Sequence, residues 1–453
     1  RGQMAEYFSI PIEDSLESIF DAVRGSALIQ QKGGSVRLNF SKIRPKGDII
    51  ATTHGYASGP MSFIKILDTV TTTIKRGGRG CGSNIAVLSV DHPDILEFIT
   101  CNEHQIINFN MFVSITDKFM EAVAKNAEYE LINPKNGKTV NKLNANDVLE
   151  LIASNAWKNN KPGIIFSEET IERQPFMDYE AGILGAINLA NFTNKLEIDW
   201  QRLKNTVDLC VHFLDNMIDA CDYIVPEINK TAIAKRKIGL GTMGFEALLL
   251  KLKIPYNSER AIQMTENLME FISKEARVYS EKLGLLRGSF PDFKVAPPRQ
   301  DVNFLAPPRR TGSPTKSAYP AKGITHMRNE TVTAITPTEI LAALAECSAD
   351  IESPSATTSN NDLLNTIKIQ TVFQKHVDNA VPATIRLPEN ATVNDIKKVY
   401  ALAYKLKCKG LTVGRESYSR KKNLRGGAKM IISKNSEEVI LPFAQSDQVL
   451  SGL

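Results

Sequence analysis

Residues 163–192 of this 453-residue chain read GIIFSEETIERQPFMDYEAGILGAINLANF, two apolar runs with a polar interval between them. The first run, Gly163–Phe166, is short, apolar and β-branched, which predicts a buried strand. Similar short runs recur between helical patterns, at Ile85–Leu88, Met111–Ile115, Thr331–Ile335 and Thr384–Leu387. Strands that alternate with helices indicate parallel β-α units. We therefore predict an α/β fold, built as a barrel or as a doubly wound sheet.

Apolar periodicity and capping residues predict three clear helices. Apolar residues return at helical spacing over Trp200–Ala220 and form one stripe. Ser258 is an N-cap candidate ahead of a second stripe. Thr392 and Asp395 form a capping-box pattern ahead of a third. A short buried strand, Leu411–Val413, follows that last helix directly.

The composition is that of a globular protein with a small excess of positive charge. Hydrophobic residues make up 42 % of the chain, and the formal net charge is +5. The apolar runs are too short to cross a bilayer, so we expect no membrane span. The charge permits an anionic partner such as a nucleic acid, but the single Arg-Gly-Gly element near residue 76 supports this only weakly.

Six cysteines are scattered singly along the chain, at Cys81, Cys101, Cys210, Cys221, Cys347 and Cys408. None forms a C-x-x-C pair, so we expect no structural metal site. Isolated thiols suit a reducing compartment, and we interpret them as small core residues. Two alternatives stay open. Cys347 could be a functional thiol rather than a buried inert one, and Cys81 could be a reactive thiol in a glycine-rich, anion-binding loop.

We predict one domain over residues 1–414, followed by a basic tail over residues 415–453. Within the domain, the proline-rich residues 295–323 predict a long irregular loop. The Ser/Thr/Asn-rich residues 353–366 predict a shortened linker. The chain starts at Arg1 rather than Met, so we expect an intracellular protein, cytoplasmic or organellar after removal of an N-terminal segment.

Several motifs stand in a fixed order along the chain. They are Ile10–Phe20, Asn39–Asp48, Ala57–Phe63, Arg76–Leu88, Asp91–Ile99, Asn108–Phe119, Arg236–Phe245 (RKIGLGTMGF), Gly288–Phe293, Met327–Thr338 (MRNETVTAITPT), Phe373–Leu387 and Leu402–Arg415. With Gly185–Phe192 (GAINLANF), this series resembles the large, catalytic subunit of ribonucleotide reductases, above all the adenosylcobalamin-dependent class II type. Each motif alone is a weak signal, whereas their common order is specific.

The resemblance implies a ten-stranded α/β barrel with a finger loop at its centre. In the family, a cysteine on that loop holds a thiyl radical made from adenosylcobalamin, and two further cysteines supply electrons. A glutamate and an asparagine assist at the ribose hydroxyls. Here the approach to the loop and the insert after Ile351 are much shorter than in the family. We therefore expect a shortened barrel whose finger loop and part of whose second half are reduced or lost.

The resemblance also assigns positions to the catalytic groups. Counted back without gaps from the GAINL motif, Gly182 stands at the second redox cysteine and Ile171 at the radical cysteine. The same count places Arg173 at the glutamate and Glu169 at the asparagine, and Tyr7 stands at the first redox cysteine. An isoleucine cannot hold a thiyl radical, and an arginine stays protonated and only donates. We predict that the catalytic residues are lost.

The substrate-phosphate loop departs from the family pattern as well. The family reads Pro-Thr-Gly-Thr-Ile-Ser, whereas Pro337 and Thr338 are followed here by Glu339. That residue would bring a negative charge to the anion site, and the missing glycine removes a tight turn. The earlier glycine-rich stretch also differs, because residues 33–37 read GGSVR where the family has Gly-Gly-Gly-Thr-Gly.

We interpret the chain as a non-catalytic relative of these reductases. Its role would be structural or regulatory, as a subunit of a larger assembly, with protein partners, a homodimer as a further form, and no cofactor. Two alternatives stay open. One is an active adenosylcobalamin-dependent reductase with one of the six cysteines at the barrel centre. The other is a nucleotide or cobalamin sensor without chemistry.

Overall fold

The structure is a computed structural model of the whole chain. It describes residues 3–51, 53–74, 84–101, 106–167, 179–294, 325–335, 338–348, 351, 360–378, 384–415, 429–434 and 437–442. Several positions singled out in the sequence lie outside these ranges, namely Cys81, Glu169, Ile171, Arg173, Pro337 and the predicted loop 295–323.

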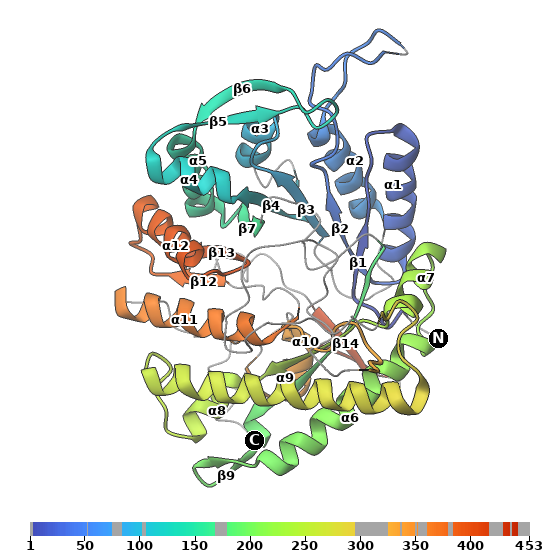
Figure 1. Ribbon diagram of the computed structural model, residues 1–453, viewed down its shortest axis with the longest axis vertical. Helices are drawn as coiled ribbons and strands as arrows, with labels where there is room; N and C mark the ends of the chain where they lie inside the picture. Colours follow the sequence, from blue (N-terminus) through green and yellow to red (C-terminus); the bar gives the residue numbers. More distant parts are fainter. Residues whose placement is uncertain are drawn as a thin grey trace.

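A nine-stranded sheet forms the centre of the molecule, and its first half is parallel. This half runs in chain order through β1 (Tyr7–Ile10), β2 (Ser35–Asn39), β3 (Asn84–Ser89), β4 (Phe109–Thr116) and β7 (Gly163–Ser167). The helices of this half are α1 (Leu16–Gln31), α2 (Pro60–Thr73), α3 (Ile95–Thr100), α4 (Asp117–Lys125) and α5 (Ala145–Asn159). They lie together in the blue to teal part of Figure 1.

Two antiparallel seams join the second half of the sheet to the first. β1 pairs with β8 (Ala181–Asn188), and β7 pairs with β13 (Gly410–Arg415). The outer strands are β11 (Ile238–Met243) beside β8 and β12 (Thr384–Leu387) beside β13, each in parallel pairing. The order across the sheet is therefore β11-β8-β1-β2-β3-β4-β7-β13-β12.

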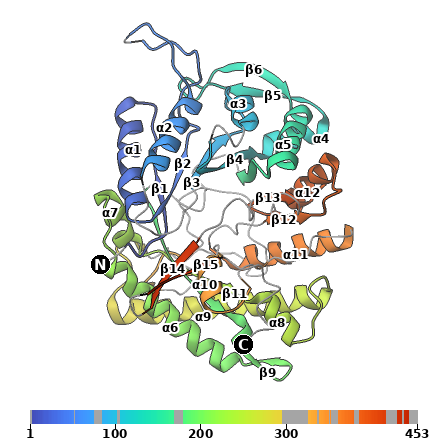
Figure 2. The same ribbon diagram turned by 180° about the vertical axis from the view of Figure 1, so that it is seen from behind.

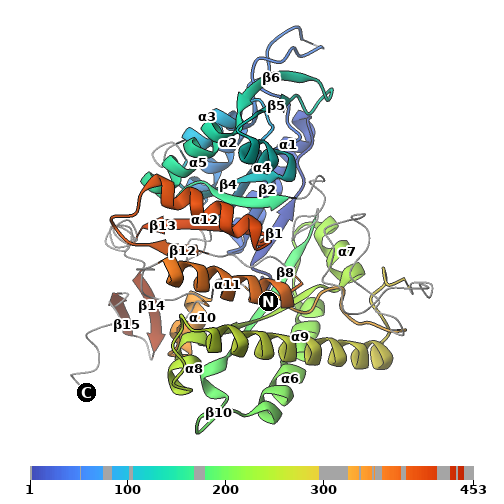
Figure 3. The same ribbon diagram turned by 60° about the vertical axis from the view of Figure 1, so that its left-hand side comes forward.

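Seven helices are described in the second half of the chain. They are α6 (Trp200–Ala220), α7 (Pro226–Lys235), α8 (Phe245–Lys251), α9 (Glu259–Arg287), α10 (Glu339–Leu344), α11 (Asn360–His376) and α12 (Val393–Lys405). Figures 1 and 3 show α9 as a long helix crossing the molecule beside α6 and α11. The α12 helix packs on α5 of the first half, next to β13.

The remaining elements are small. Three antiparallel pairs lie outside the main sheet, namely β5 (Glu128–Ile132) with β6 (Thr139–Asn144), β9 (Thr193–Asn194) with β10 (Glu197–Ile198), and β14 (Lys429–Lys434) with β15 (Glu437–Pro442). A 3₁₀ turn, Leu189–Asn191, follows β8. Figure 2 shows the β14–β15 pair from behind, near α10. The region that was predicted as a basic tail therefore contains a hairpin.

The α/β prediction is confirmed, and the large central sheet fits a shortened barrel. All three predicted helices form, and the side chains of Ser258 and Thr392 cap α9 and α12 as expected. The predicted strand Thr331–Ile335 is reduced to one parallel bridge, between Thr333 and Leu240. The predicted linker 353–366 is wrong in its second part, because α11 already begins at Asn360. The apolar side chains of Ile367, Ile369 and Phe373 are buried. The packing of this helix in the core outweighs the low helix propensity of its polar first residues.

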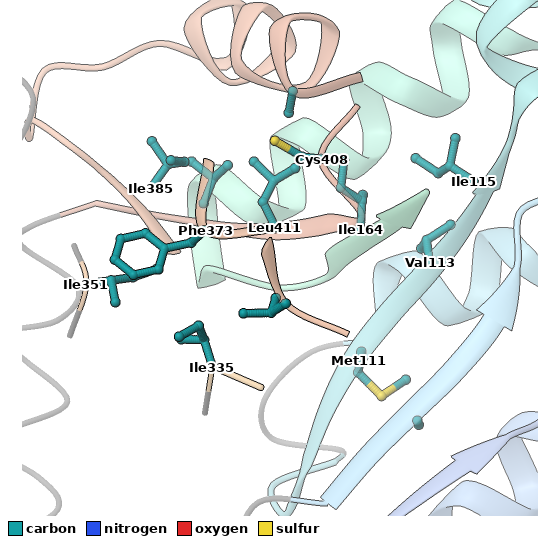
Figure 4. Close-up of a cluster of buried hydrophobic side chains, with 14 of the residues drawn as sticks. Met111, Val113, Ile115, Ile164, Ile335, Ile351, Phe373, Ile385, Cys408 and Leu411 are labelled. Carbon is teal, nitrogen blue, oxygen red and sulfur yellow. The ribbon is translucent and has the colours of Figure 1, made fainter. Parts of the chain in front are cut away.

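Two glycines let the segment around Ala334 approach β11. A Cβ atom at Gly241 would lie 2.4 Å from the carbonyl oxygen of Ala334, and one at Gly239 would lie 2.7 Å from the Ala334 Cβ. The core beside this region is apolar, and Figure 4 shows a cluster that includes Phe373, Leu411, Ile164 and Cys408. The second half of the sheet is thus held by close backbone packing and by aliphatic contacts.

Candidate functional site

The β1–β8 seam brings together two of the predicted site positions. Tyr7 and Gly182 are direct partners in its antiparallel register, although 175 residues separate them in sequence. Gly182 is buried and Tyr7 is half-buried. A Cβ atom at Gly182 would meet the side chain of Leu184 at 3.5 Å, an ordinary contact. The seam could therefore seat a larger residue at this point, but it now presents a phenol opposite a glycine.

The side chain of Tyr7 lies on the sheet face that points away from α1. Ile10 contacts Gly25 of α1, and Gly34 lies against Phe8 and Ile29. Because successive side chains alternate between faces, Tyr7 and its alternate neighbours occupy the other face. The register of β1 with β2 then places Ser9 beside Arg37 on that same face. This inner face is where the resemblance places the chemistry of the family.

A buried ion cluster lies next to the Tyr7–Gly182 pair. Glu180, whose side chain is only 3 % exposed, accepts from Lys237 at 2.5 Å and from Lys235 at 3.3 Å. The backbone carbonyl of Glu180 accepts from the Ser9 N–H at 2.8 Å, which fixes this residue at the seam. Burial lowers the pKa of Arg37 to about 10, and the nearby negative charge of Glu180 acts in the opposite direction.

The charges of this cluster explain how it stabilises the fold. Lys237 also approaches Glu330 at 3.5 Å, so three cations surround two carboxylates. A buried carboxylate is stable as an anion only with such partners. The cluster therefore joins β2, β8 and the start of β11 electrostatically at one end of the seam. Sequence analysis noted Arg37 only as a departure from a glycine-rich pattern and missed its partners.

A second buried network joins two of the motifs behind the resemblance to helix α6. The side chain of Asp215 on α6 is fully buried and accepts from Arg236 Nε at 2.9 Å, from Arg328 Nε at 3.2 Å and from Asn329 Nδ2 at 3.0 Å. Arg236 also makes a bidentate pair with Asp219, at 2.7 and 2.8 Å. These bonds raise the pKa of Arg236 although burial alone would lower it, and they lower the pKa of Asp219.

The network explains why the RKIGLG and MRNET motifs need these residue types. Arg236 caps α7 in the left-handed region, with φ at 47°, and its guanidinium turns back to α6. Asn329 donates to the carbonyl of Arg236 at 2.9 Å as well as to Asp215. The motif residues thus dock α6 and the Arg328 segment around the start of β11. Their role in this arrangement is to hold the fold together.

The predicted phosphate-loop residues stand at the start of a short helix. Thr338 is buried and takes the N-cap position of α10, and Glu339 is its first residue. The helix spans six residues, and the chain then turns through Cys347 to Ser348. The carbonyl of Ser348 accepts from the Gly244 N–H at 2.8 Å, which places this turn at the carboxyl end of β11.

The five described cysteines do not form a disulfide. Cys101 follows α3, Cys210 lies on α6, Cys221 follows α6, Cys347 follows α10 and Cys408 precedes β13. Burial raises the pKa values of Cys101, Cys210, Cys347 and Cys408, which favours the thiol over the thiolate. The prediction that they are small buried residues fits Cys408, which is buried, whereas the other four are half-buried.

In the described ranges, no group of three or more His, Cys, Asp or Glu side chains is arranged to hold a metal ion. The helices described here include none that is both long enough and apolar enough to span a membrane.

Comparison with known proteins identifies relatives along the whole chain. Over 97 % of its length, the chain is 32 % identical to the vitamin B12-dependent ribonucleoside-diphosphate reductase of Thermoplasma acidophilum, covering 65 % of that protein. It is 34 % identical over 91 % of its length to the enzyme of the same name from Mycobacterium tuberculosis, covering 68 % of it. A reductase subunit alpha from Chlamydia pneumoniae is 22 % identical over 77 % of the chain.

These relatives contradict the interpretation of the chain as a non-catalytic protein. Identity of 32–34 % extends over more than nine tenths of the chain, and both relatives carry the name of a vitamin B12-dependent ribonucleoside-diphosphate reductase. The interpretation relied on a few substituted positions, three of which lie outside the described residues. The comparisons favour the active alternative instead.

The chain spans about two thirds of the length of these two relatives, 65 % and 68 %. A family profile described as "Ribonucleotide reductase, barrel domain" matches residues 7–364 and 355–414. The matched region begins at β1 and ends at β13, so it contains every strand of the nine-stranded sheet. The chain therefore belongs to the ribonucleotide reductase barrel-domain family.

Proposed function

We propose that this chain is the barrel of a B12-dependent ribonucleotide reductase, which converts ribonucleoside diphosphates to their deoxy forms. The observation that carries the proposal is the similarity of 32 % and 34 % identity to two reductases of this name, over 97 % and 91 % of the chain. Support from the structure comes from the antiparallel seam, which brings Tyr7 of β1 and Gly182 of β8 face to face.

The cofactor in this proposal is adenosylcobalamin, supported by the names of the relatives. Such a cofactor supplies a radical, which in this family passes to a thiol. The position that the resemblance assigns to this thiol is Ile171, which contains no sulfur, and the redox positions Tyr7 and Gly182 at the seam contain none either. We therefore derive no step through the cofactor.

The site positions remain part of the proposal. Tyr7 and Gly182 stand where the resemblance places redox cysteines, and Thr338 and Glu339 stand at the phosphate loop. Because Ile171 cannot hold a thiyl radical, the proposed activity needs one of the six cysteines of the chain instead. Protein partners, a homodimer and binding of nucleic acid remain predictions.

A direct assay tests the proposal. The purified full chain is incubated with CDP or ADP, adenosylcobalamin and excess dithiothreitol, and deoxynucleotide is measured by chromatography. We expect repeated turnover that disappears when the cofactor is omitted. Binding of nucleotide or cobalamin by calorimetry without any product would contradict the proposal and favour the sensor alternative.

Single Cys→Ser variants at all six cysteines would then identify the essential thiol. A hydroxyl cannot exchange hydrogen with ribose as a thiol does, so the variant at the essential position should lose turnover. The other five should keep it, and they serve as matched controls. Equal activity in all six variants would contradict a thiol-based reaction in this chain.

A further inference from the structure

A surface cavity lies between the end of α5 and the start of α12, two helices that pack on each other (Figures 1 and 3). Its volume is about 340 Å³, within the range of cavities that hold small ligands. It is lined by Trp157, Glu389, Asn390, Ala391, Thr392 and Val393. These residues belong to neither strand of the β1–β8 seam, so the cavity is separate from the site described above.

Hydrogen bonds hold the walls of this cavity in place. The indole Nε1–H of Trp157 donates to the Ala391 carbonyl at 2.7 Å, across 234 residues of sequence, and this bond orients the ring. The Ala391 N–H donates to the Pro388 carbonyl at 3.0 Å and closes the turn before α12. Thr392 then caps α12 in a capping box with Asp395. The shape of the cavity is therefore set by the fold itself.

Glu389 brings a carboxylate to the rim of the cavity. This residue is exposed, and in the part of the chain that the structure describes it forms no ion pair. Two lysines in the first turns of α12 already have partners, because Lys397 pairs with Glu150 at 3.2 Å and Lys398 pairs with Asp395 at 3.1 Å. The cavity thus combines a tryptophan with a negative charge that is not neutralised.

This combination fits a flat cation. A guanidinium group can stack on an indole ring while its N–H groups donate to a carboxylate, and tryptophan is the best aromatic partner for a cation. An anionic group would be repelled by Glu389. A purely apolar group would desolvate that carboxylate without giving it a partner. Charge complementarity therefore favours arginine over the other kinds of side chain.

We propose that this cavity binds an arginine side chain presented by a partner polypeptide. The guanidinium lies against Trp157 and donates to Glu389, and the partner chain crosses the exposed residues Asn390 and Thr392. The proposal concerns protein recognition rather than the reaction, so it does not depend on the proposed function.

Tryptophan fluorescence tests the proposal, because the chain contains two tryptophans, Trp157 and Trp200. In a Trp200→Phe background, the emission of Trp157 reports on the cavity alone. The probe is the peptide acetyl-Gly-Gly-Arg-Gly-Gly-amide, and its matched control carries citrulline, which has nearly the shape of arginine but no charge. We expect a saturable change of emission with the arginine peptide and binding at least about threefold weaker with the citrulline peptide.

A variant in the same background tests the carboxylate directly. Glu389→Gln should weaken binding of the arginine peptide at least about threefold and leave binding of the citrulline peptide unchanged. The control is Glu150→Gln, at a carboxylate that is 63 % exposed and outside the lining of the cavity. It should bind both peptides like the parent. Circular dichroism checks that each variant keeps its helix content.

Several results would overturn the proposal. No saturable change at millimolar peptide would show that the cavity does not bind this group. Equal binding of the two peptides, or no effect of Glu389→Gln, would show that charge plays no part. If Trp157 responds only after Arg420, Lys421 and Lys422 are replaced by alanine, the occupant is the basic tail of the chain rather than a partner.

Discussion

Asp215 accepts hydrogen bonds from Arg236, Arg328 and Asn329 while its own side chain is fully buried. Replacing it by Asn keeps the shape but removes the charge that the guanidinium groups of Arg236, Arg328 and Arg287 need. Breaking a buried ion pair in this way costs about 3–5 kcal/mol. We expect Asp215→Asn to lower the free energy of unfolding by an amount of that order, measured by urea denaturation.

The matched control for this variant is Asp219→Asn. Asp219 bonds to the same arginine, but its side chain is 53 % exposed. Exposed ion pairs contribute less, about 1 kcal/mol or below. Equal losses of stability in the two variants would contradict the role given to burial.

His92 is a second residue whose surroundings predict a measurable effect. Its Nε2 lies 2.8 Å from the Ile43 carbonyl, and its Nδ1 accepts from the Asp94 N–H at 3.0 Å. Burial lowers its pKa from 6.5, although Ile43, Asp94 and Asp91 act in the opposite direction. The folded state therefore favours the neutral ring, so the stabilising contribution is complete above pH 6.5 and is lost as the pH falls below it.

The direction of this pH dependence of stability can be measured from the midpoints of urea unfolding between pH 5 and 8. The wild type should lose stability below pH 6.5 more steeply than His92→Gln, with a difference in slope of at most about 1.4 kcal/mol per pH unit. His54→Gln, at an exposed histidine, should follow the wild type. A steeper acid loss in His92→Gln would contradict the prediction.

At the scale of elements, the glycines of β11 determine how closely the Ala334 segment can approach. In Gly241→Ala, the new Cβ would meet the Ala334 carbonyl at 2.4 Å, and backbone atoms cannot give way cheaply. Overpacking of this kind costs about 1–3 kcal/mol. We expect a loss of unfolding free energy in that range, together with faster hydrogen exchange of the Leu240 amide, which donates to Val332.

Gly185→Ala, on neighbouring β8, is the control. There the new Cβ would meet the end of the Leu214 side chain at 3.2 Å, and that side chain can adjust. The loss should therefore be clearly smaller than at Gly241. A larger loss at Gly185 would show that backbone proximity is not what limits this strand.

The sequence predicted the positions of single helices and strands better than it predicted any other feature of the fold. The capping residues Ser258 and Thr392 mark the starts of α9 and α12, because their signals are local in the chain. The start of α11 at Asn360 was missed, because a polar run resembles a linker until packing decides. The β14–β15 hairpin was missed for the same reason, since basic flanking residues suggested a solvated tail.

At the scale of the whole molecule, Glu180 connects the two halves of the sheet. Its carboxylate accepts from Lys235 and Lys237 beside β11, and it lies close to Arg37 on β2. In Glu180→Gln, Lys235, Lys237 and Arg37 would lose the negative charge that they share at this position. We expect a loss of about 3 kcal/mol or more in unfolding free energy.

The destabilisation caused by Glu180→Gln should be strongest at the β1–β8 seam. Hydrogen exchange of the Ser9 amide, which donates to the Glu180 carbonyl, should accelerate more than exchange in α9. Glu13→Gln, which removes an exposed pair with Lys42, should leave both unchanged. Uniform acceleration throughout the chain would argue against a local role at the seam.

The candidate site could be predicted only in part from the sequence. The ungapped count placed Tyr7 and Gly182 at related positions, and the structure puts them opposite each other. The cluster around Glu180 could not be predicted, because its charges come from four separate segments that only the fold brings together. The functional interpretation was wrong because a few substituted positions were weighted above similarity along the whole chain.

The two antiparallel seams also have a consequence for synthesis of the chain. The strands β1 to β7 pair with sequence neighbours and can assemble as they leave the ribosome. The outer edge of β1 stays unpaired until β8, which starts at residue 181, has been synthesised. The outer edge of β7 stays unpaired until β13, which starts at residue 410, has been synthesised. Until then both are bare sheet edges, which attract other chains. The nascent first half, ending in the Gly163 strand, should therefore be a chaperone client until residue 410 has been synthesised.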